Sequence, residues 1–333
     1  AGIATINQYA FRYCQSLESF TVGANNQGEY QSLEGVLYDK TSLIQYPVQK
    51  KEETYVIPEG YTEIKGYAFY KNTYLNYIKM NKQITTIGDN AFEGVTKVRT
   101  MTLPQSLTTI GTNVFKSMSE LKLVVSRSSN QVKCGTDVFA STTSELEIYI
   151  NKTSTDEKLC SNDNTKKTVS TYGETGTYID YITTTDSEMI IYGKGEMNNF
   201  ETIEEQPWIS EGENIQTIKI DERVTTIGKN AFNSLKEVVT VTIPSTITTI
   251  GSYSFQSSGI TEVTIPTSVS SIGELVFNKC PKLTKITVET GNTAYKDIEG
   301  VLFETTTNTL ISYPIGNETK IYSIPSGTKT IEK

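Results

Sequence analysis

The stretch Ile87-Gly88-Asp89-Asn90-Ala91-Phe92 decides the fold, because the pattern Ile-Gly-x-x-Ala-Phe returns along the chain at a nearly fixed pitch. The copies begin 23 residues apart, with one step of 22. Their first residues are Ile64, Ile87 and Ile110 and, after a gap, Ile227, Ile250 and Ile272. A period in this range is typical of a solenoid, in which each repeat stacks on its neighbours instead of folding alone.

A second pattern begins six residues after each Phe, where apolar side chains occupy positions one, four and six of a short run. Val98, Met101 and Leu103 are one example, and Pro104 then turns the chain. This is the LxxLxL strand of a leucine-rich repeat, with positions four and six facing the core and the residues between them facing solvent on a concave sheet. The sequence therefore predicts a β-rich solenoid of leucine-rich repeat arrays with a short helical or irregular convex side.

The repeats fall into two arrays, at residues 1–150 and 215–333. Between them the composition turns polar over residues 151–176, which predicts a linker or a loosely packed cap. Residues 177–214 return to β-rich sequence and hold the only tryptophan, Trp208. We expect this capping segment to place Trp208 over an open end of the second array rather than in a ligand site.

Each array also holds an insertion that interrupts the pitch. The insertions lie at about residues 23–57 and about residues 289–324. Both contain the sequence Glu-Gly-Val-Leu, a polar tip and a second apolar run that ends in Tyr-Pro. Two short apolar strands around a polar tip predict a β-hairpin. We therefore expect one hairpin module in each array.

The composition excludes several kinds of chemistry. The 333 residues carry a formal net charge of −8, which argues against nucleic acid as a partner because phosphate binding needs a basic face. The chain has no histidine, so His-based catalytic triads and His-ligated zinc are excluded. No apolar run approaches the roughly 20 residues that cross a bilayer. We predict no enzyme activity, no cofactor, no metal and no transmembrane segment.

Four cysteines lie far apart in the sequence. Cys14 and Cys280 each follow a repeat Phe by three residues, and Cys134 replaces the Ile of its unit. These positions predict buried, unpaired thiols at Cys14, Cys134 and Cys280, with Cys160 in a polar loop. A disulfide between Cys134 and Cys160 is the alternative, and the absence of a dense cysteine framework disfavours it.

These features resemble the BspA-like leucine-rich repeat family, also described as Treponema pallidum-type repeats. The resemblance rests on the units of the form Ile243-Pro244 to Phe255, on the Glu-Gly-Val-Leu hairpins and on the block from Gly193 to Trp208. It covers nearly the whole chain apart from residues 151–176, and the departures are Lys65 for Gly and Cys134 for Ile. The resemblance implies an extracellular or cell-surface adhesin that binds host matrix proteins or other cells, with no catalytic residues.

The outward positions of the concave sheet are the candidate partner-binding residues. In the first array they would form an exposed aromatic and aliphatic patch with two charges, at Tyr77, Lys79, Leu123, Val125, Glu147 and Tyr149. Such patches mark interfaces, although Thr and Tyr are also ordinary residues of a solvated β-face. The second array presents mostly Thr with mixed charges, which favours an ordinary surface. The leading hypothesis is a non-enzymatic extracellular protein that binds a protein or glycan ligand, such as a host matrix protein.

A structural role is the alternative hypothesis. The chain begins just before the Ile position of one unit, at Ile6, and ends just after it in another, at Ile331. Such half-units are expected for a piece of a longer surface stalk, for head-to-tail self-association into a fibre, or for a chain trimmed within an array.

Overall fold

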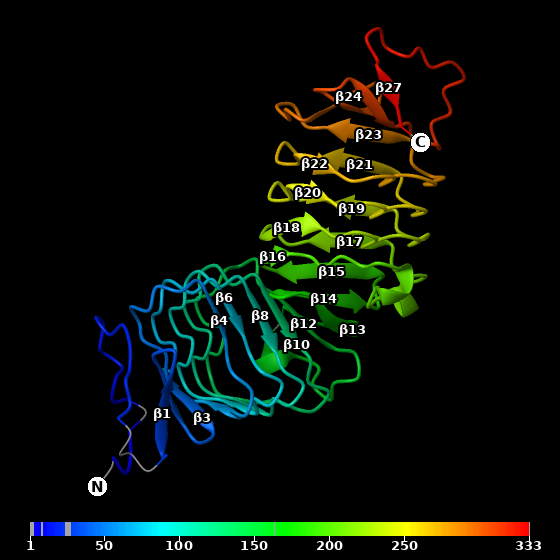
Figure 1. The fold of residues 1–333 in the computed structure, drawn as a ribbon. Helices are drawn as coiled ribbons and strands as arrows, with labels where there is room; N and C mark the ends of the chain where they lie inside the picture. Colours follow the sequence, from blue (N-terminus) through cyan, green and yellow to red (C-terminus); the bar gives the residue numbers. More distant parts are fainter. Residues whose placement is uncertain (1–2, 8, 24–27, 163, 333) are drawn as a thin grey trace. The chain divides into compact units, whose positions relative to one another are not determined.

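The computed structural model describes residues 3–7, 9–23, 28–162 and 164–332 (Figure 1). It is a β-solenoid, as predicted, and the chain divides into two compact units, Ala1–Val169 and Ser170–Lys333. The boundary falls within strand β13 (Thr165–Gly176). In the described ranges the helices are short 3-10 turns, namely η1 (Leu159–Ser161), η2 (Ile203–Glu205) and η3 (Ile209–Glu211).

The first side of the first unit is a seven-stranded sheet. It starts with the antiparallel strands β1, β2 and β3 and continues with one short parallel strand from each successive rung, where a rung is one turn of the solenoid. The core-facing partners along the parallel part are Leu43, Ile64, Ile87, Ile110 and Cys134. The strands are β1 (Tyr30–Leu33), β2 (Val36–Asp39), β3 (Ser42–Gln45), β5 (Glu63–Ile64), β7 (Thr86–Ile87), β9 (Thr109–Ile110) and β11 (Lys133–Cys134).

The second side of this unit is formed by the LxxLxL strands. They pair in parallel, so that Val124 of one rung lies between Met101 and Ile148 of its neighbours. Strands β8 (Thr100–Leu103), β10 (Leu123–Ser126) and β12 (Glu147–Asn151) form one ladder, which continues into β13. Strands β4 (Thr54–Val56) and β6 (Tyr77–Lys79) form a separate parallel pair on the same side.

The convex side of the solenoid is irregular but still hydrogen-bonded from rung to rung. The backbone N–H of Phe69 donates to the carbonyl of Ala91 at 2.8 Å, and that of Phe92 donates to Val114 at 3.0 Å. The backbone groups of the turns are therefore satisfied without a helix.

The second unit repeats this organisation. Antiparallel strands β14 and β15 lead into the parallel ladder β15-β17-β19, and β21 pairs with β23 on the same side of the repeat. A second ladder runs β16-β18-β20-β22, and the hairpin strands β24, β25 and β26 end on β27. The strands are β14 (Ile179–Thr184), β15 (Glu188–Gly193), β16 (Gly195–Glu196), β17 (Thr217–Ile220), β18 (Val224–Ile227), β19 (Thr240–Thr242), β20 (Thr249–Ile250), β21 (Glu262–Ile265), β22 (Ser271–Ile272), β23 (Lys285–Val288), β24 (Tyr295–Ile298), β25 (Val301–Glu304), β26 (Thr309–Ser312) and β27 (Thr330–Ile331).

The repeat Phe residues form a stack of rings through the core of each unit. In the first unit successive ring centroids from Tyr46 to Phe139 lie 5.0–5.8 Å apart, with nearly parallel planes. In the second unit the indole of Trp208 stacks on Phe232 at 5.8 Å, and its Nε1 donates to the carbonyl of Ala231 at 3.1 Å. Trp208 is fully buried at the head of this stack, so it has a packing role there.

The glycine of Ile-Gly is needed for space between rungs rather than for an unusual backbone conformation. In Gly111 and Gly251 the backbone does not adopt the left-handed region, but an added Cβ would lie 2.6 Å from the backbone nitrogen of Asp89 and 2.5 Å from that of Lys229. The glycine therefore allows close approach of neighbouring rungs. The left-handed conformation occurs two residues later, at Asn90 and its counterparts, where φ is near 55°.

The described residues of the polar segment 151–176 include regular secondary structure. They hold the end of β12, the 3-10 turn η1 and the long strand β13. The two insertions hold the antiparallel strands β1–β3 and β24–β26.

Candidate functional site

The predicted patch on the first unit is not open to solvent. The side chains of Tyr77, Leu123, Val125 and Tyr149 are buried, with Val125 and Tyr149 fully inaccessible, while Lys79 and Glu147 are half-buried. The expectation of an exposed aromatic and aliphatic patch was therefore wrong.

Neighbouring strands explain part of this burial. Val125 lies in register between Thr102 and Tyr149 in the parallel ladder, so side chains flank it on both sides. The ammonium of Lys166 lies 5.0 Å from the centroid of the Tyr149 ring and forms a salt bridge of 2.6 Å with Glu147. The hydrogen bond to Glu147 raises the pKa of Lys166, and the Tyr149 hydroxyl accepts a further hydrogen bond from Lys166 at 3.2 Å. Glu147 and Tyr149 are thus held in a polar network.

The exposed concave face belongs to the second unit. Strands β19 and β21 alternate between exposed and buried residues, as a half-buried strand should. Its exposed outward side chains are Lys219, Thr240, Thr242, Glu262, Thr264 and Lys285. Registered pairs place Lys219 beside Thr242 and Glu262 beside Lys285 on neighbouring strands. We call these six residues the threonine face.

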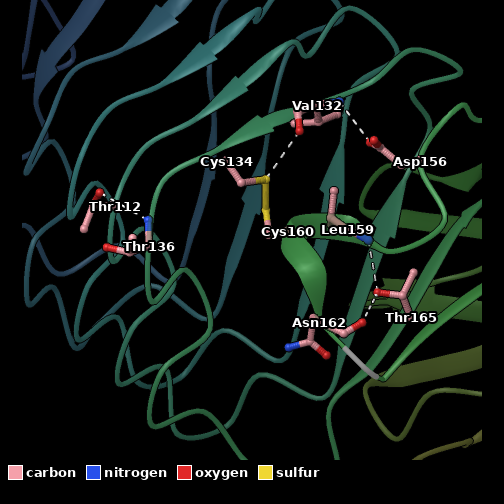
Figure 2. The surroundings of a disulfide bond; sticks show 9 residues. All are labelled: Thr112, Val132, Cys134, Thr136, Asp156, Leu159, Cys160, Asn162 and Thr165. Atoms are coloured by element: carbon pink, nitrogen blue, oxygen red, sulfur yellow. Dashed lines mark hydrogen bonds between the residues drawn. A yellow bond between two sulfur atoms is a disulfide. The ribbon is translucent and has the colours of Figure 1, made fainter.

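A disulfide joins Cys134 of β11 to Cys160 of η1, with 5.3 Å between the two Cα atoms (Figure 2). The prediction of an unpaired Cys134 was therefore wrong. The 26-residue separation is close to one repeat, which is the signal that could have favoured the bond. Such a spacing places two cysteines on consecutive turns of a solenoid.

The disulfide fixes a segment that covers the last described strand of the seven-stranded sheet. Asp156 accepts a hydrogen bond from the backbone N–H of Val132 at 2.9 Å, which satisfies a donor beside β11 (Figure 2). Leu159 is buried in the core of the first unit, and its N–H donates to Thr165 Oγ1 at 3.2 Å. We call residues 154–162 the disulfide cap, because they cover a strand edge and close the apolar core.

The remaining two cysteines differ from each other. Cys280 is buried, its Sγ donates to the carbonyl of Phe255 at 3.0 Å, and burial raises its pKa. Cys14 is exposed, contrary to the prediction. Cys280 packs against the preceding rung through Phe255 and Ser258.

The described residues contain no cluster of three or more His, Cys, Asp or Glu side chains suited to a metal ion. Among the helices that the structure describes, none has the length and apolar character needed to span a membrane.

Comparison with known proteins agrees with this architecture. Residues 1–50, 48–166 and 202–328 match the family model of the BspA type leucine rich repeat region, in six copies. No curated protein matches the chain.

Several solved structures are similar. A leucine-rich repeat protein from Eubacterium ventriosum ATCC 27560 is 25% identical over 48% of this chain, with a TM-score of 0.33. A leucine rich cell surface protein from Faecalibacterium prausnitzii A2-165 is 21% identical over 93% of this chain, with a TM-score of 0.37. The leucine rich repeat protein of T. pallidum is 16% identical, covers 70% of this chain and 78% of its own, and has a TM-score of 0.30. The chain spans only 55% and 65% of the first two proteins.

Proposed function

Because the chain belongs to the BspA type leucine rich repeat family, we propose that it is a non-enzymatic protein that acts outside the cytoplasm by binding a partner protein through its solenoid surface. A location at the cell surface is part of this proposal. The Cys134–Cys160 disulfide supports it, because disulfides persist in oxidising compartments and are rare in the cytosol.

The observation that carries the binding role is the threonine face. Its outward side chains are exposed on neighbouring strands, at the regular spacing of a β-ladder, and they offer hydroxyl groups and charges of both signs. Because none of the six is a large apolar residue, binding would rest on hydrogen bonds and charge pairs. Such an interface forms with modest affinity and weakens as salt rises.

Binding of the full chain to immobilised fibronectin, laminin and collagen tests the proposal. Thr242→Glu with Thr264→Glu places two new charges on adjacent strands of the face, and we expect it to weaken binding at least about tenfold. Thr248→Glu with Ser270→Glu is the matched control, since both residues are exposed but precede β20 and β22 on the other ladder. Equal loss in both variants, or no loss in the first, would place the contact elsewhere.

A further inference from the structure

A cluster of tyrosines around an arginine lies on the convex side of the first unit. The repeat pattern aligns its two halves, Tyr9-Ala10-Phe11-Arg12-Tyr13 and Tyr67-Ala68-Phe69-Tyr70-Lys71. Ring centroids of Tyr9 and Tyr67 lie 5.3 Å apart, and those of Tyr67 and Tyr70 lie 5.2 Å apart. The members of this tyrosine–arginine cluster are Tyr9, Arg12, Tyr13, Tyr67, Tyr70 and Lys71.

Two cations share this cluster. The Arg12 guanidinium carbon lies 4.4 Å from the Tyr67 centroid, 5.0 Å from that of Tyr13 and 5.6 Å from that of Tyr70. The Lys71 ammonium lies 5.1 Å from the centroid of Tyr70, so one ring is shared by both charges. At these distances the cations form cation–π interactions with the rings. The guanidinium uses its face for this contact, so its in-plane N–H groups can still form hydrogen bonds.

The cluster lacks an anion. Within the described ranges, neither Arg12 nor Lys71 forms a salt bridge with a carboxylate. The Nε of Arg12 is buried and has no hydrogen-bond partner in the described part of the chain. A buried donor without a partner costs free energy unless a ligand supplies the acceptor. Arg12 hydrogen-bonds to the side chain of Tyr70, but neither cation has a carboxylate partner among the described residues. In a chain with a net charge of −8, two such cations at one place favour an acidic ligand.

A small cavity opens beside these groups. It has a volume of about 80 Å³, and its lining includes Arg12, Tyr13, Cys14, Tyr70 and Lys71. This volume is large enough for a carboxylate. Tyr13 beside the cavity is 71% exposed, and its ring has an apolar face with a polar tip. A sugar ring can stack on such a face while its acidic group enters the cavity.

We propose that the tyrosine–arginine cluster binds the carboxylate of an acidic saccharide, with Arg12 and Lys71 pairing with the carboxylate and Tyr13 stacking on the sugar. The site is separate from the threonine face and does not depend on it. Its ligand would be a sugar acid at the end of a glycan, because one exposed ring and one small cavity accommodate a terminal residue.

Calorimetry on the full chain tests the site with 3′-sialyllactose, lactose and hexaglutamate as probes. We expect sialyllactose to bind at least about tenfold more tightly than either of the others, since lactose lacks the carboxylate and hexaglutamate lacks the sugar. Lys71→Gln should weaken sialyllactose binding about tenfold, and Lys116→Gln, a convex-side lysine outside the cluster, should leave it unchanged. Equal binding of lactose or of hexaglutamate overturns the proposal, as does full binding by Lys71→Gln.

Cys14 provides a second readout that reports on the same cavity. Saturating sialyllactose should slow maleimide labelling of Cys14 several-fold, while buried Cys280 remains unlabelled as an internal reference. Arg12→Lys keeps the positive charge but loses the planar guanidinium, so it should weaken binding. Unlike Arg12→Gln, which removes the charge, it should not destabilise the first rung. An unchanged labelling rate of Cys14 in the presence of bound saccharide overturns the assignment to this cavity.

Discussion

The glycine after the repeat Ile lies where neighbouring rungs approach closely, as at Gly111 and Gly251. Gly111→Ala would place a methyl group 2.6 Å from the backbone nitrogen of Asp89, and that neighbour cannot move without disturbing its own rung. We expect a loss of about 1–3 kcal/mol in the free energy of unfolding, the usual range for overpacking. Urea denaturation of the variant measures it. Gly23→Ala is the control, because a Cβ there meets no atom of the described residues within 4 Å, and a similar loss in both variants would contradict the account.

Single residues also show which features could be predicted from the sequence and which could not. The inward Ile, Phe and LxxLxL positions were predictable because burial follows the periods of the solenoid and the strand. Exposure was less predictable, since period two places Val125 and Tyr149 on the outward face but does not reveal what neighbours such as Lys166 contribute. The pairing of Cys134 depended on where a polar loop crosses a strand edge, which periodicity does not encode.

Among the structural elements, the ring stacks join the repeat Phe residues of successive rungs within the core of each unit. Phe255 is fully buried and lies 5.4 Å from Phe232 and 5.9 Å from Phe277. Phe255→Ala should therefore cost about 3–5 kcal/mol of stability. Hydrogen exchange should show lost protection in the rungs on both sides, because stability in a solenoid is shared between neighbours. A cost below about 1 kcal/mol in chemical denaturation would mean that the rings do not support one another.

The disulfide cap is the element whose removal should open the first unit. Closing a loop between Cys134 and Cys160 stabilises the folded state by about 3 kcal/mol, by the usual dependence on loop length. We expect Cys134→Ser with Cys160→Ser to lower the unfolding midpoint of the first unit and to speed hydrogen exchange around β11 and Leu159. Exchange in the second unit serves as the internal control. Unchanged exchange around β11 would show that the hydrogen bonds of Asp156 and Thr165 hold the disulfide cap in place without the disulfide.

The tyrosines beside the first hairpin predict a response to alkaline pH. Burial raises the pKa of Tyr38, Tyr46 and Tyr55 above the ordinary value near 10, and the Tyr38 and Tyr55 hydroxyls hydrogen-bond to each other. Below pH 10 these tyrosines contribute fully to the free energy of unfolding. Above pH 10 the phenols ionise first in the unfolded state, so the free energy of unfolding falls by up to about 1.4 kcal/mol per pH unit for each group.

Denaturation at pH 8 and pH 11 measures this loss, with Tyr46→Phe as the matched variant. The Tyr46 hydroxyl is buried, and in the described part of the chain it has no hydrogen-bond partner, so Phe preserves the packing. The variant should lose less stability between the two pH values than the wild type. Identical losses would show that these phenols do not control the alkaline limit.

For the whole molecule, the fold was predictable from one feature, the recurrence of Ile-Gly-x-x-Ala-Phe, because a repeated unit with an apolar face has few ways to bury it except by stacking. The candidate binding surfaces were not predictable, since a solenoid presents the same backbone at every rung and only side-chain surroundings distinguish one face from another. The threonine face and the tyrosine–arginine cluster emerged from burial and distance.

The disulfide has a mechanical consequence. Under tension applied to its two ends, a stacked protein can unravel rung by rung and lengthen by about 3.3–3.6 Å for every residue released. While the disulfide is closed, the residues between Cys134 and Cys160 cannot be extended. The fully extended chain is therefore about 85 Å shorter than after reduction. Single-molecule stretching before and after reduction should differ by this amount. The disulfide would then limit how far the first unit can extend under force.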